Sequence, residues 1–172
     1  VKNLTVTASS VTTYYADKST KGTAGMIVGS LENGNLIGCT TGSDCRVQAA
    51  SIAGGLVGIA KNSEIRYCVN NARVEILPSK EIAEAQSQEN VANYSAAGVL
   101  AWGGGNTVSH CANYGKIVLG NITKGTPSIL TAGGIIGYQT TGDRVSDCYN
   151  CGEVNGDAGT FKTRVTVGGI SG

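Results

Sequence analysis

A repeated unit constrains this chain more than any other feature. The clearest copy has the sequence AGGLVG at 53–58 and continues as SEIRYCVN at 63–70. Its outline returns between residues 132 and 150, and looser or partial copies complete the set. Repetition at a near-constant spacing predicts a stack of similar coils, so it has to be read before any other pattern.

The spacing of the copies predicts coils of constant size joined by loops of variable length. Counted between first glycines, the intervals are 29, 44, 35 and 35 residues, and the copies start near Gly25, Gly54, Gly98, Gly133 and Gly168. The chain opens and closes within a unit. We therefore expect residues 1–172 to form a single solenoid domain that is a piece of a longer protein or a processed form.

Each unit contains two short runs rich in β-branched residues, and a poorer third run precedes each Ala-Gly-Gly. Turn-forming pairs separate the first two runs: Asn33-Gly34, Lys61-Asn62, Gly105-Asn106 and Thr141-Gly142. In the second run the apolar positions slip out of phase between Ile65 and Cys68, which predicts a bend or bulge. Three strands per turn predict an all-β, right-handed parallel β-solenoid of about four to five coils, stacked about 4.8 Å apart.

Four cysteines hold the same place in successive coils, and Leu4 holds it in the opening half-coil. They are Cys39, Cys68, Cys111 and Cys148. A position that accepts either leucine or cysteine is an interior apolar position, so we expect a column of reduced, buried thiols. Parallel side chains in such a stack also suit the disulfide torsion poorly. Cys45 and Cys151 stand outside the column, and the sequence leaves their redox state open.

An asparagine recurs two residues after each of the last three of these cysteines, at Asn70, Asn113 and Asn150. This predicts a stacked asparagine turn, in which each side-chain amide bonds the backbone of the next coil.

The charge balance excludes several classes of partner. The formal net charge is +1, with neither sign in blocks, which argues against nucleic acid or an anionic membrane as a partner. No apolar run approaches the ~18 residues of a membrane span, so we expect no membrane insertion in this segment.

The repeat resembles the GLUG-type repeat of bacterial surface proteins over nearly the whole chain. The resemblance rests on Gly-Gly-Leu-Val-Gly, then Ile-x-x-Cys-x-Asn, and a closing apolar residue at Val74, Ile117 and Val154. The segment 148–154 is the closest local match. Such repeats occur in adhesin-like proteins and beside the catalytic domain of some immunoglobulin-cleaving metallopeptidases. The resemblance therefore implies a secreted or cell-surface scaffold without chemistry of its own.

The third copy departs from this pattern. Trp102 falls where other coils have glycine, unless Gly103 takes that place after a one-residue insertion. The sequence leaves the register open there, and it favours packing as the role of Trp102.

No catalytic, metal or cofactor site is predicted. His110 is the single histidine and takes a solvent-facing place in the repeat, and there is no His-Glu-x-x-His. Cys148-x-x-Cys151 has no second close-spaced pair to complete a zinc site. The segment 156–163 approaches a phosphate-binding loop but lacks the glycine before its lysine.

A polysaccharide lyase or glycosidase of the β-helix type is the less favoured, enzymatic alternative. Such enzymes need carboxylates that converge on adjacent coils. The richest charge clusters are Asp143, Arg144 and Asp147, and then Glu64 and Arg66. In the repeat, Glu64 and Arg144 share a column but lie two coils apart, with Thr107 between them, so surface ion pairs explain these charges better.

Ligand binding by loops is the favoured function. The variable loops emerge along one side of the solenoid, approximately at 9–23, 77–95, 119–127 and 155–163, and 80–86 favours a short helix. Their aromatic residues are the predicted ligand contacts: Tyr14, Tyr15, Tyr94 and Phe161. We expect a non-enzymatic, extracellular or cell-surface scaffold of a bacterial surface protein, which presents loops for adhesion to a host or matrix glycan or protein. The alternative is a structural subunit that stacks head-to-tail with further copies into a fibre.

Overall fold

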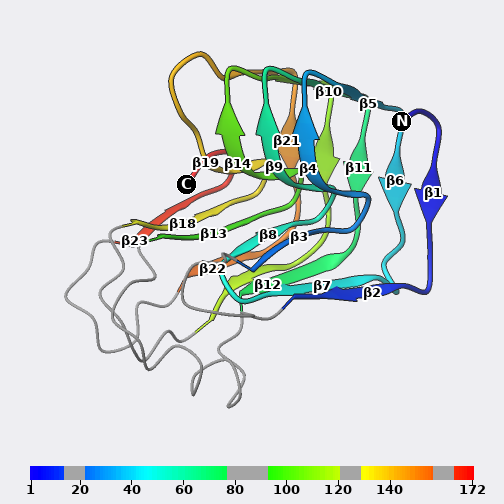
Figure 1. Ribbon diagram of the computed structural model, residues 1–172. Coiled ribbons are helices and arrows are strands. Elements are labelled where there is room, and N and C mark those ends of the chain that lie inside the picture. The colour runs from blue at the N-terminus through cyan, green and yellow to red at the C-terminus, as the bar shows by residue number, and fades with distance from the viewer. Residues whose placement is uncertain (14–21, 77–92, 121–128, 157–164) are drawn as a thin grey trace.

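The computed structural model shows a parallel β-solenoid (Figure 1). It describes residues 1–13, 22–76, 93–120, 129–156 and 165–172. In these residues the chain forms 23 short strands and no helix. Every strand pair is parallel, and the strands form five sheets of four or five members each, with no closed barrel.

Each sheet collects one strand from each coil and is named here by its first strand. The β1 sheet contains β1 (Thr5–Val6), β6 (Thr40–Thr41), β11 (Val69–Asn70), β16 (Ala112–Asn113) and β21 (Tyr149–Asn150). The β2 sheet contains β2 (Ser10–Thr12), β7 (Arg46–Ala49), β12 (Arg73–Ile76), β17 (Ile117–Leu119) and β22 (Val154–Gly156). The β3 sheet contains β3 (Thr23–Gly25), β8 (Ile52–Gly54), β13 (Asn93–Ala97), β18 (Ile129–Gly133) and β23 (Val165–Gly168). The β4 sheet contains β4 (Val28–Glu32), β9 (Val57–Lys61), β14 (Leu100–Gly104) and β19 (Ile136–Tyr138). The β5 sheet contains β5 (Asn35–Ile37), β10 (Glu64–Arg66), β15 (Thr107–Ser109) and β20 (Arg144–Ser146).

Five strands per full coil replace the three that the repeat predicted. Left-handed residues divide the predicted second run into two strands: Tyr67 has φ 54° between β10 and β11, and His110 has φ 53° between β15 and β16. The expected bend between Ile65 and Cys68 is therefore confirmed. The turns before it are confirmed as well, since Asn62 (φ 47°) and Gly105 (φ 73°) adopt the left-handed conformation that asparagine and glycine accept.

The register of the third coil resolves the place of Trp102. Trp102 pairs with Ile59 of the coil before it and with Tyr138 of the coil after it, and Ala101 takes the place of Gly58. Ala97 pairs with Gly54, so the third unit starts one residue before Gly98. The sequence predicted that either Trp102 or Gly103 takes this glycine position. Both predictions were wrong, because Ala101 takes it.

The predicted cysteine column is confirmed, except that Cys148 at its C-terminal end is only partly buried. Cys39, Cys68 and Cys111 are fully buried, and the backbone amide of Cys39 donates to Cys68 Sγ at 3.4 Å. The amide of Cys111 donates to Cys148 Sγ at the same distance. The hydrogen bond with Cys148, the contact with Cys68 and burial together raise the pKa of Cys111, so this thiol is neutral. All six cysteines are free, with Cys45 buried and Cys151 exposed.

The asparagines form a hydrogen-bonded column of their own. Asn70 Nδ2 donates to Asn113 Oδ1 at 2.8 Å, and Asn113 Nδ2 donates to Asn150 Oδ1 at 2.7 Å. Thr41 Oγ1 begins the column by donating to Asn70 Oδ1. Each asparagine also bonds the backbone two residues on, as Asn113 does with Gly115. The predicted pattern is thus corrected: the side chain bonds its own coil's backbone and the next coil's side chain.

The second glycine of each repeat makes room for this column. A Cβ at Gly98 would lie 2.3 Å from Asn113 Cγ, so a side chain there cannot coexist with the asparagine. Met26 takes the glycine place in the coil where Thr41 replaces the asparagine. The residue after the first glycine of a unit therefore depends on the residue that fills the asparagine position of the same coil. Where that position holds asparagine the neighbour is glycine, and where it holds the shorter threonine the neighbour can be larger.

Four undescribed segments, 14–21, 77–92, 121–128 and 157–164, all join the β2 sheet to the β3 sheet. The points where the variable insertions leave and rejoin the described stack therefore share one side of it, as predicted. The predicted loop bounds were too wide, because Ser10–Thr12 forms β2 and Leu119 ends β17. The predicted helix at 80–86 lies outside the described residues.

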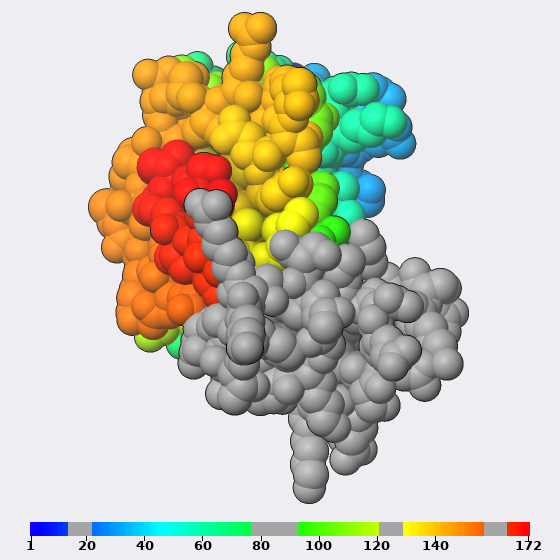
Figure 2. All heavy atoms as spheres, turned by 90° about the vertical axis from the view of Figure 1, so that its left-hand side faces the viewer, coloured from blue at the N-terminus to red at the C-terminus, as the bar shows by residue number. Residues whose placement is uncertain are grey.

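Figure 2 looks onto the C-terminal end of the stack, where orange and red residues lie in front.

We predict that Asn113→Ala lowers the free energy of unfolding by about 2–4 kcal/mol, because it leaves several buried hydrogen-bonding groups without a partner. Urea denaturation followed by circular dichroism measures this loss. Asn155→Ala is the matched control, since the exposed Asn155 side chain donates only to Glu153 among the residues that the structure describes; a change within about 0.5 kcal/mol is expected. Equal effects of the two substitutions would contradict the asparagine column.

We also predict that a thiol reagent labels Cys151 first in the native protein, because this side chain is exposed while Cys39, Cys68 and Cys111 are fully buried. Denaturation in the absence of reductant should release all six thiols. Mass spectrometry counts the labels. A count of two or fewer in denaturant would show disulfides in place of the reduced column.

Candidate functional site

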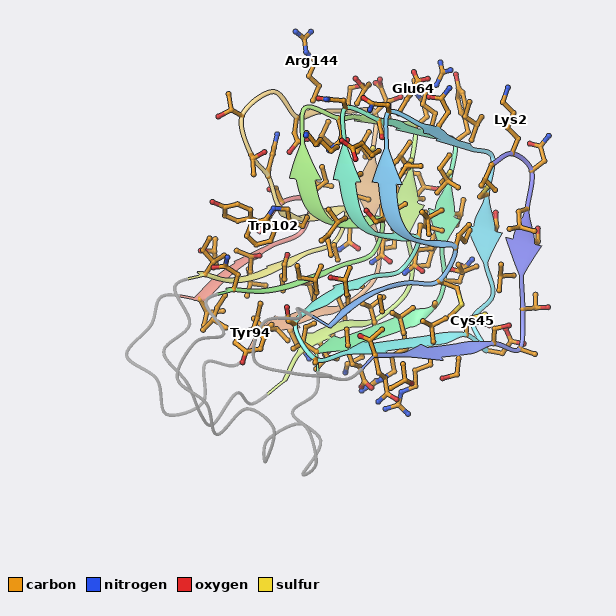
Figure 3. All side chains as sticks on the ribbon, in the orientation of Figure 1. Lys2, Cys45, Glu64, Tyr94, Trp102 and Arg144 are labelled. Carbon is orange, nitrogen blue, oxygen red and sulfur yellow. The ribbon has the colours of Figure 1, made fainter. Side chains whose placement is uncertain are left out.

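The predicted ligand contacts are only partly within the described structure. Tyr14, Tyr15 and Phe161 lie outside the described residues. Tyr94 lies in β13 and is 1% exposed, where it packs in the main core cluster with residues such as Ile76 and Leu130 (Figure 3). The prediction of Tyr94 as a ligand contact is therefore corrected, because a side chain buried in the core does not meet an external ligand.

The charges considered for an enzyme mostly have structural partners. Glu64 and Arg66 form an ion pair at 2.9 Å. Thr107 stands between Glu64 and Arg144 in the β5 sheet, as the repeat alignment predicted. Glu64 and Arg144 therefore lie two strand spacings apart, roughly 9–10 Å.

Asp143 closes a turn. Its Oδ1 accepts hydrogen bonds from the backbone and side-chain nitrogens of Asn106, both at 2.8 Å. Its Oδ2 accepts from the backbone nitrogen of Thr140 at 2.9 Å. Both carboxylate oxygens are thereby engaged in holding the turn between β19 and β20.

Glu75 is a buried carboxylate on the β2 sheet. Its side chain is 2% exposed and pairs with two half-exposed arginines, Arg46 and Arg73. Burial disfavours its charge, but hydrogen bonds from Arg73 and then Arg46 outweigh this and lower the pKa of Glu75. Arg46 and Arg73 are neighbours in adjacent strands, so the carboxylate offsets the repulsion between them. This arrangement explains Glu75 as a structural group.

Three exposed tyrosines gather at the β1 sheet and its corners. They are Tyr67, Tyr114 and Tyr149, each about half exposed. The other exposed large hydrophobic residues of the described structure lie in the first half-coil or the last: Val1, Leu4, Val167 and Ile170. Tyr67 and Tyr114 are exposed within the body of the stack, and Tyr149 joins them from the edge strand β21. Clustered exposed aromatic rings are the informative exception to burial, so this surface is the strongest candidate for binding. We call Tyr67, His110, Tyr114, Asp147 and Tyr149 the tyrosine face.

Local backbone structure directs these side chains outward. Tyr67, His110 and Asp147 occupy the left-handed corner just before the cysteine of the column, with φ between 52° and 54°. Tyr149 lies in β21 between Cys148 and Asn150, whose side chains belong to the two interior columns. Because side chains alternate along a strand, Tyr149 faces solvent.

Contacts between coils order the tyrosine face. The rings of Tyr67 and His110 lie 4.9 Å apart between centroids, and His110 Nε2 lies 3.9 Å from Asp147 Oδ2. Tyr114 and Tyr149 pack edge to face, and their hydroxyl oxygens are 2.6 Å apart. The hydrogen bond to Tyr149 raises the pKa of Tyr114, because only the neutral phenol can donate its proton.

Sequence reasoning missed this surface although it placed His110 correctly. His110 is half exposed, as its place in the repeat predicted. The signal for the rest was present: Tyr67 stands in the same column as His110 and Asp147, and Tyr149 adjoins Cys148 of the cysteine column. The contact between Tyr114 and Tyr149 depends on packing between coils, which no single unit reveals.

No group of three or more His, Cys, Asp or Glu side chains in the described residues is placed to hold a metal ion. Those residues also contain no helix that is long and apolar enough to cross a membrane.

Comparison with known proteins identifies one similar solved structure. It is described as "a putative immunoglobulin A1 protease from Bacteroides ovatus", with 15% sequence identity and a TM-score of 0.44. The match covers 95% of this chain and 67% of that chain. No protein-family profile matches the chain, and no curated protein is significantly similar to it.

We predict that Tyr149→Phe lowers the pKa of Tyr114 toward the ordinary tyrosine value, because the hydrogen bond that stabilises the neutral phenol is lost. Carbon-13 NMR of ring-labelled tyrosine across an alkaline titration measures it. Tyr67→Phe is the control, since Tyr67 contacts His110 instead. An unchanged Tyr114 titration in Tyr149→Phe would show that the two hydroxyls do not bond in solution.

Proposed function

We propose that this chain is a non-enzymatic, extracellular repeat scaffold of a bacterial surface protein, and that it adheres to a protein partner through the tyrosine face. The observation that carries the proposal is the set of three exposed, mutually ordered tyrosines on one face of a continuous stack. The extracellular, bacterial setting rests on the resemblance of the repeat to GLUG-type repeats.

The shape of the tyrosine face favours a protein over a small ligand. It spans three coils, from Tyr67 to Asp147 and Tyr149, on the outside of a sheet. Tyrosine is enriched among the residues that dominate protein–protein binding energy, because it offers a large apolar area, a hydroxyl and little conformational freedom. Two ion pairs lie on the strands and turns next to the tyrosine face: Lys116–Glu153 and Arg66–Glu64. Charged groups around an aromatic centre are typical of the polar rim of a protein interface.

The solenoid supports this role by holding the rings in place before a partner arrives. Backbone hydrogen bonds connect each coil to the next, for example from Tyr67 N to Ser109 O and from Tyr149 N to Cys111 O. Binding then costs little ordering of the backbone, so more of the contact energy appears as affinity. Tyr14, Tyr15 and Phe161 stay proposed additional contacts on the insertions.

The partners of the acidic groups support a role without catalysis. Asp143 holds a turn, Glu75 holds two arginines and Glu64 pairs with Arg66. A hydrolase or lyase needs carboxylates available to a substrate, whereas these are engaged within the fold.

We predict that Tyr67→Ala combined with Tyr149→Ala weakens binding to the protein partner at least about 30-fold, the loss expected from one interfacial hot spot. The measurement is retention of the full chain on arrays of extracellular matrix and serum proteins, followed by titration of each hit. Arg144→Ala is the control, because this exposed residue lies on the β5 sheet, outside the tyrosine face.

Two results would contradict the proposal. One is retention on proteins that survives the double tyrosine substitution. The other is the absence of any retained protein, together with retention on a parallel glycan array that the double substitution abolishes, which would make the partner of this face a glycan.

A further inference from the structure

A hollow lies on the outside of the β4 sheet. Its volume is about 380 Å³, and it is lined by residues from three successive coils: Ile59, Lys61, Asn62, Trp102, the run Gly103–Gly105, and Thr140 with Thr141. Ligand pockets of small molecules start near this size. Trp102 lies in β14 of the β4 sheet and is labelled in Figure 3.

Three glycines create the hollow. Gly104 pairs with Lys61, and Lys61 pairs with Glu32. At this position of the β4 sheet the two earlier coils therefore carry long side chains, whereas the coil of Gly104 carries none. A Cβ at Gly105 would lie 2.6 Å from Asn62 Oδ1, and one at Gly103 would lie 2.6 Å from Asp143 Oδ2. The floor is therefore bare backbone, and its neighbours leave no space for side chains at two of the three positions.

Trp102 forms one wall of the hollow, and Tyr138 packs against its ring. The rings of Trp102 and Tyr138 lie 4.2 Å apart between centroids with a 32° tilt, and Ile59 is next in the same column. Trp102 also packs on a small outer cluster of Ile52, Ala97 and Ala101. This contact agrees with the predicted packing role of Trp102, and it holds the half-buried indole in position beside the hollow.

The rim offers neutral polar groups. Within the described part of the chain, the Asn62 side chain and the Thr141 hydroxyl have no intramolecular hydrogen-bond partner. Asp143 is engaged by Asn106 and Thr140, and Lys61 lies 3.5 Å from Glu32. The hollow thus combines an apolar aromatic wall, exposed peptide groups and two unengaged neutral side chains.

We propose that this hollow binds a neutral pyranose sugar residue. The C–H face of a sugar ring packs on aromatic carbon, while its equatorial hydroxyls need donors and acceptors such as a carboxamide, a hydroxyl and peptide groups. Because the nearest carboxylates and the lysine are already engaged with other groups, the site favours an uncharged sugar over a uronate. The hollow lies on a different sheet from the tyrosine face, so the two surfaces can be tested separately.

Trp102 is the only tryptophan of the chain, so its fluorescence reports on the hollow directly. The full chain is titrated with neutral hexopyranose oligosaccharides and, in parallel, with oligouronates. A saturable shift of Trp102 emission with a neutral oligosaccharide, and a weaker one or none with the oligouronates, is the expected result. The proposal is overturned if no neutral oligosaccharide gives a saturable change across millimolar concentrations, or if the oligouronates bind better.

Asn62→Gly tests the polar rim without backbone strain, because Asn62 has φ 47° and Gly105 takes the same turn place in the next coil. The substitution should weaken the neutral sugar about threefold to tenfold, the loss of one hydrogen bond. Asn33→Gly is the matched control, with φ 49° one coil earlier and outside the hollow. Equal affinities of Asn62→Gly and Asn33→Gly would overturn the assignment.

Substitutions separate this site from the proposed adhesion. Tyr149→Ala should leave the Trp102 titration unchanged, and Asn62→Gly should leave protein retention unchanged. If the two surfaces responded together, the hollow would not be an independent site.

Discussion

The carboxamide-to-carboxamide hydrogen bond between coils is the constraint on which the rest of the structure depends. Asn70, Asn113 and Asn150 each satisfy the backbone of their own turn and at the same time bond a neighbouring coil's side chain. A buried carboxamide without a hydrogen-bond partner would cost more free energy than one such bond contributes. A break in the column would therefore destabilise the fold strongly. It therefore sets the register of the stack.

The composition of the repeat follows from this column. Glycine stands beside each asparagine because a Cβ at Gly98 or Gly134 would meet the carboxamide. Cysteine, two residues earlier, fills an interior apolar place in successive coils, where one thiol stacks above another. With the interior committed to these columns, the outward positions can vary. The tyrosine face and the hollow beside Trp102 both occupy such outward positions.

Part of this arrangement could be predicted from the sequence. The cysteine and asparagine columns recur in unbroken order, so their stacking followed from repetition alone. The number of strands did not, because the residue that breaks the second run is a glycine in one coil, Gly38, but Tyr67, His110 or Asp147 in the later coils. The third coil was misaligned because Ala97 and Ala101 replace glycines. Tyr94 was assigned to a loop because β13 begins at Asn93 without a turn signal.

The candidate surfaces were harder to predict for a physical reason. The Tyr114–Tyr149 contact joins residues 35 apart in sequence, and the hollow collects residues from three coils. Such surfaces depend on the length of each insertion, which shifts the numbering between coils without changing their stacking. Within its own unit, Gly104 is a glycine that the repeat pattern does not explain. Its role follows from the neighbouring residues Lys61 and Trp102, with which it lines the hollow.

Hydrogen exchange of the asparagine side chains, followed by NMR, tests the stacked column most directly. The carboxamide protons of Asn70 and Asn113, fully buried and bonded between coils, should exchange with solvent only when the stack opens, whereas those of exposed Asn155 should exchange at once. Exchange of Asn70 and Asn113 as fast as that of Asn155 would contradict the account.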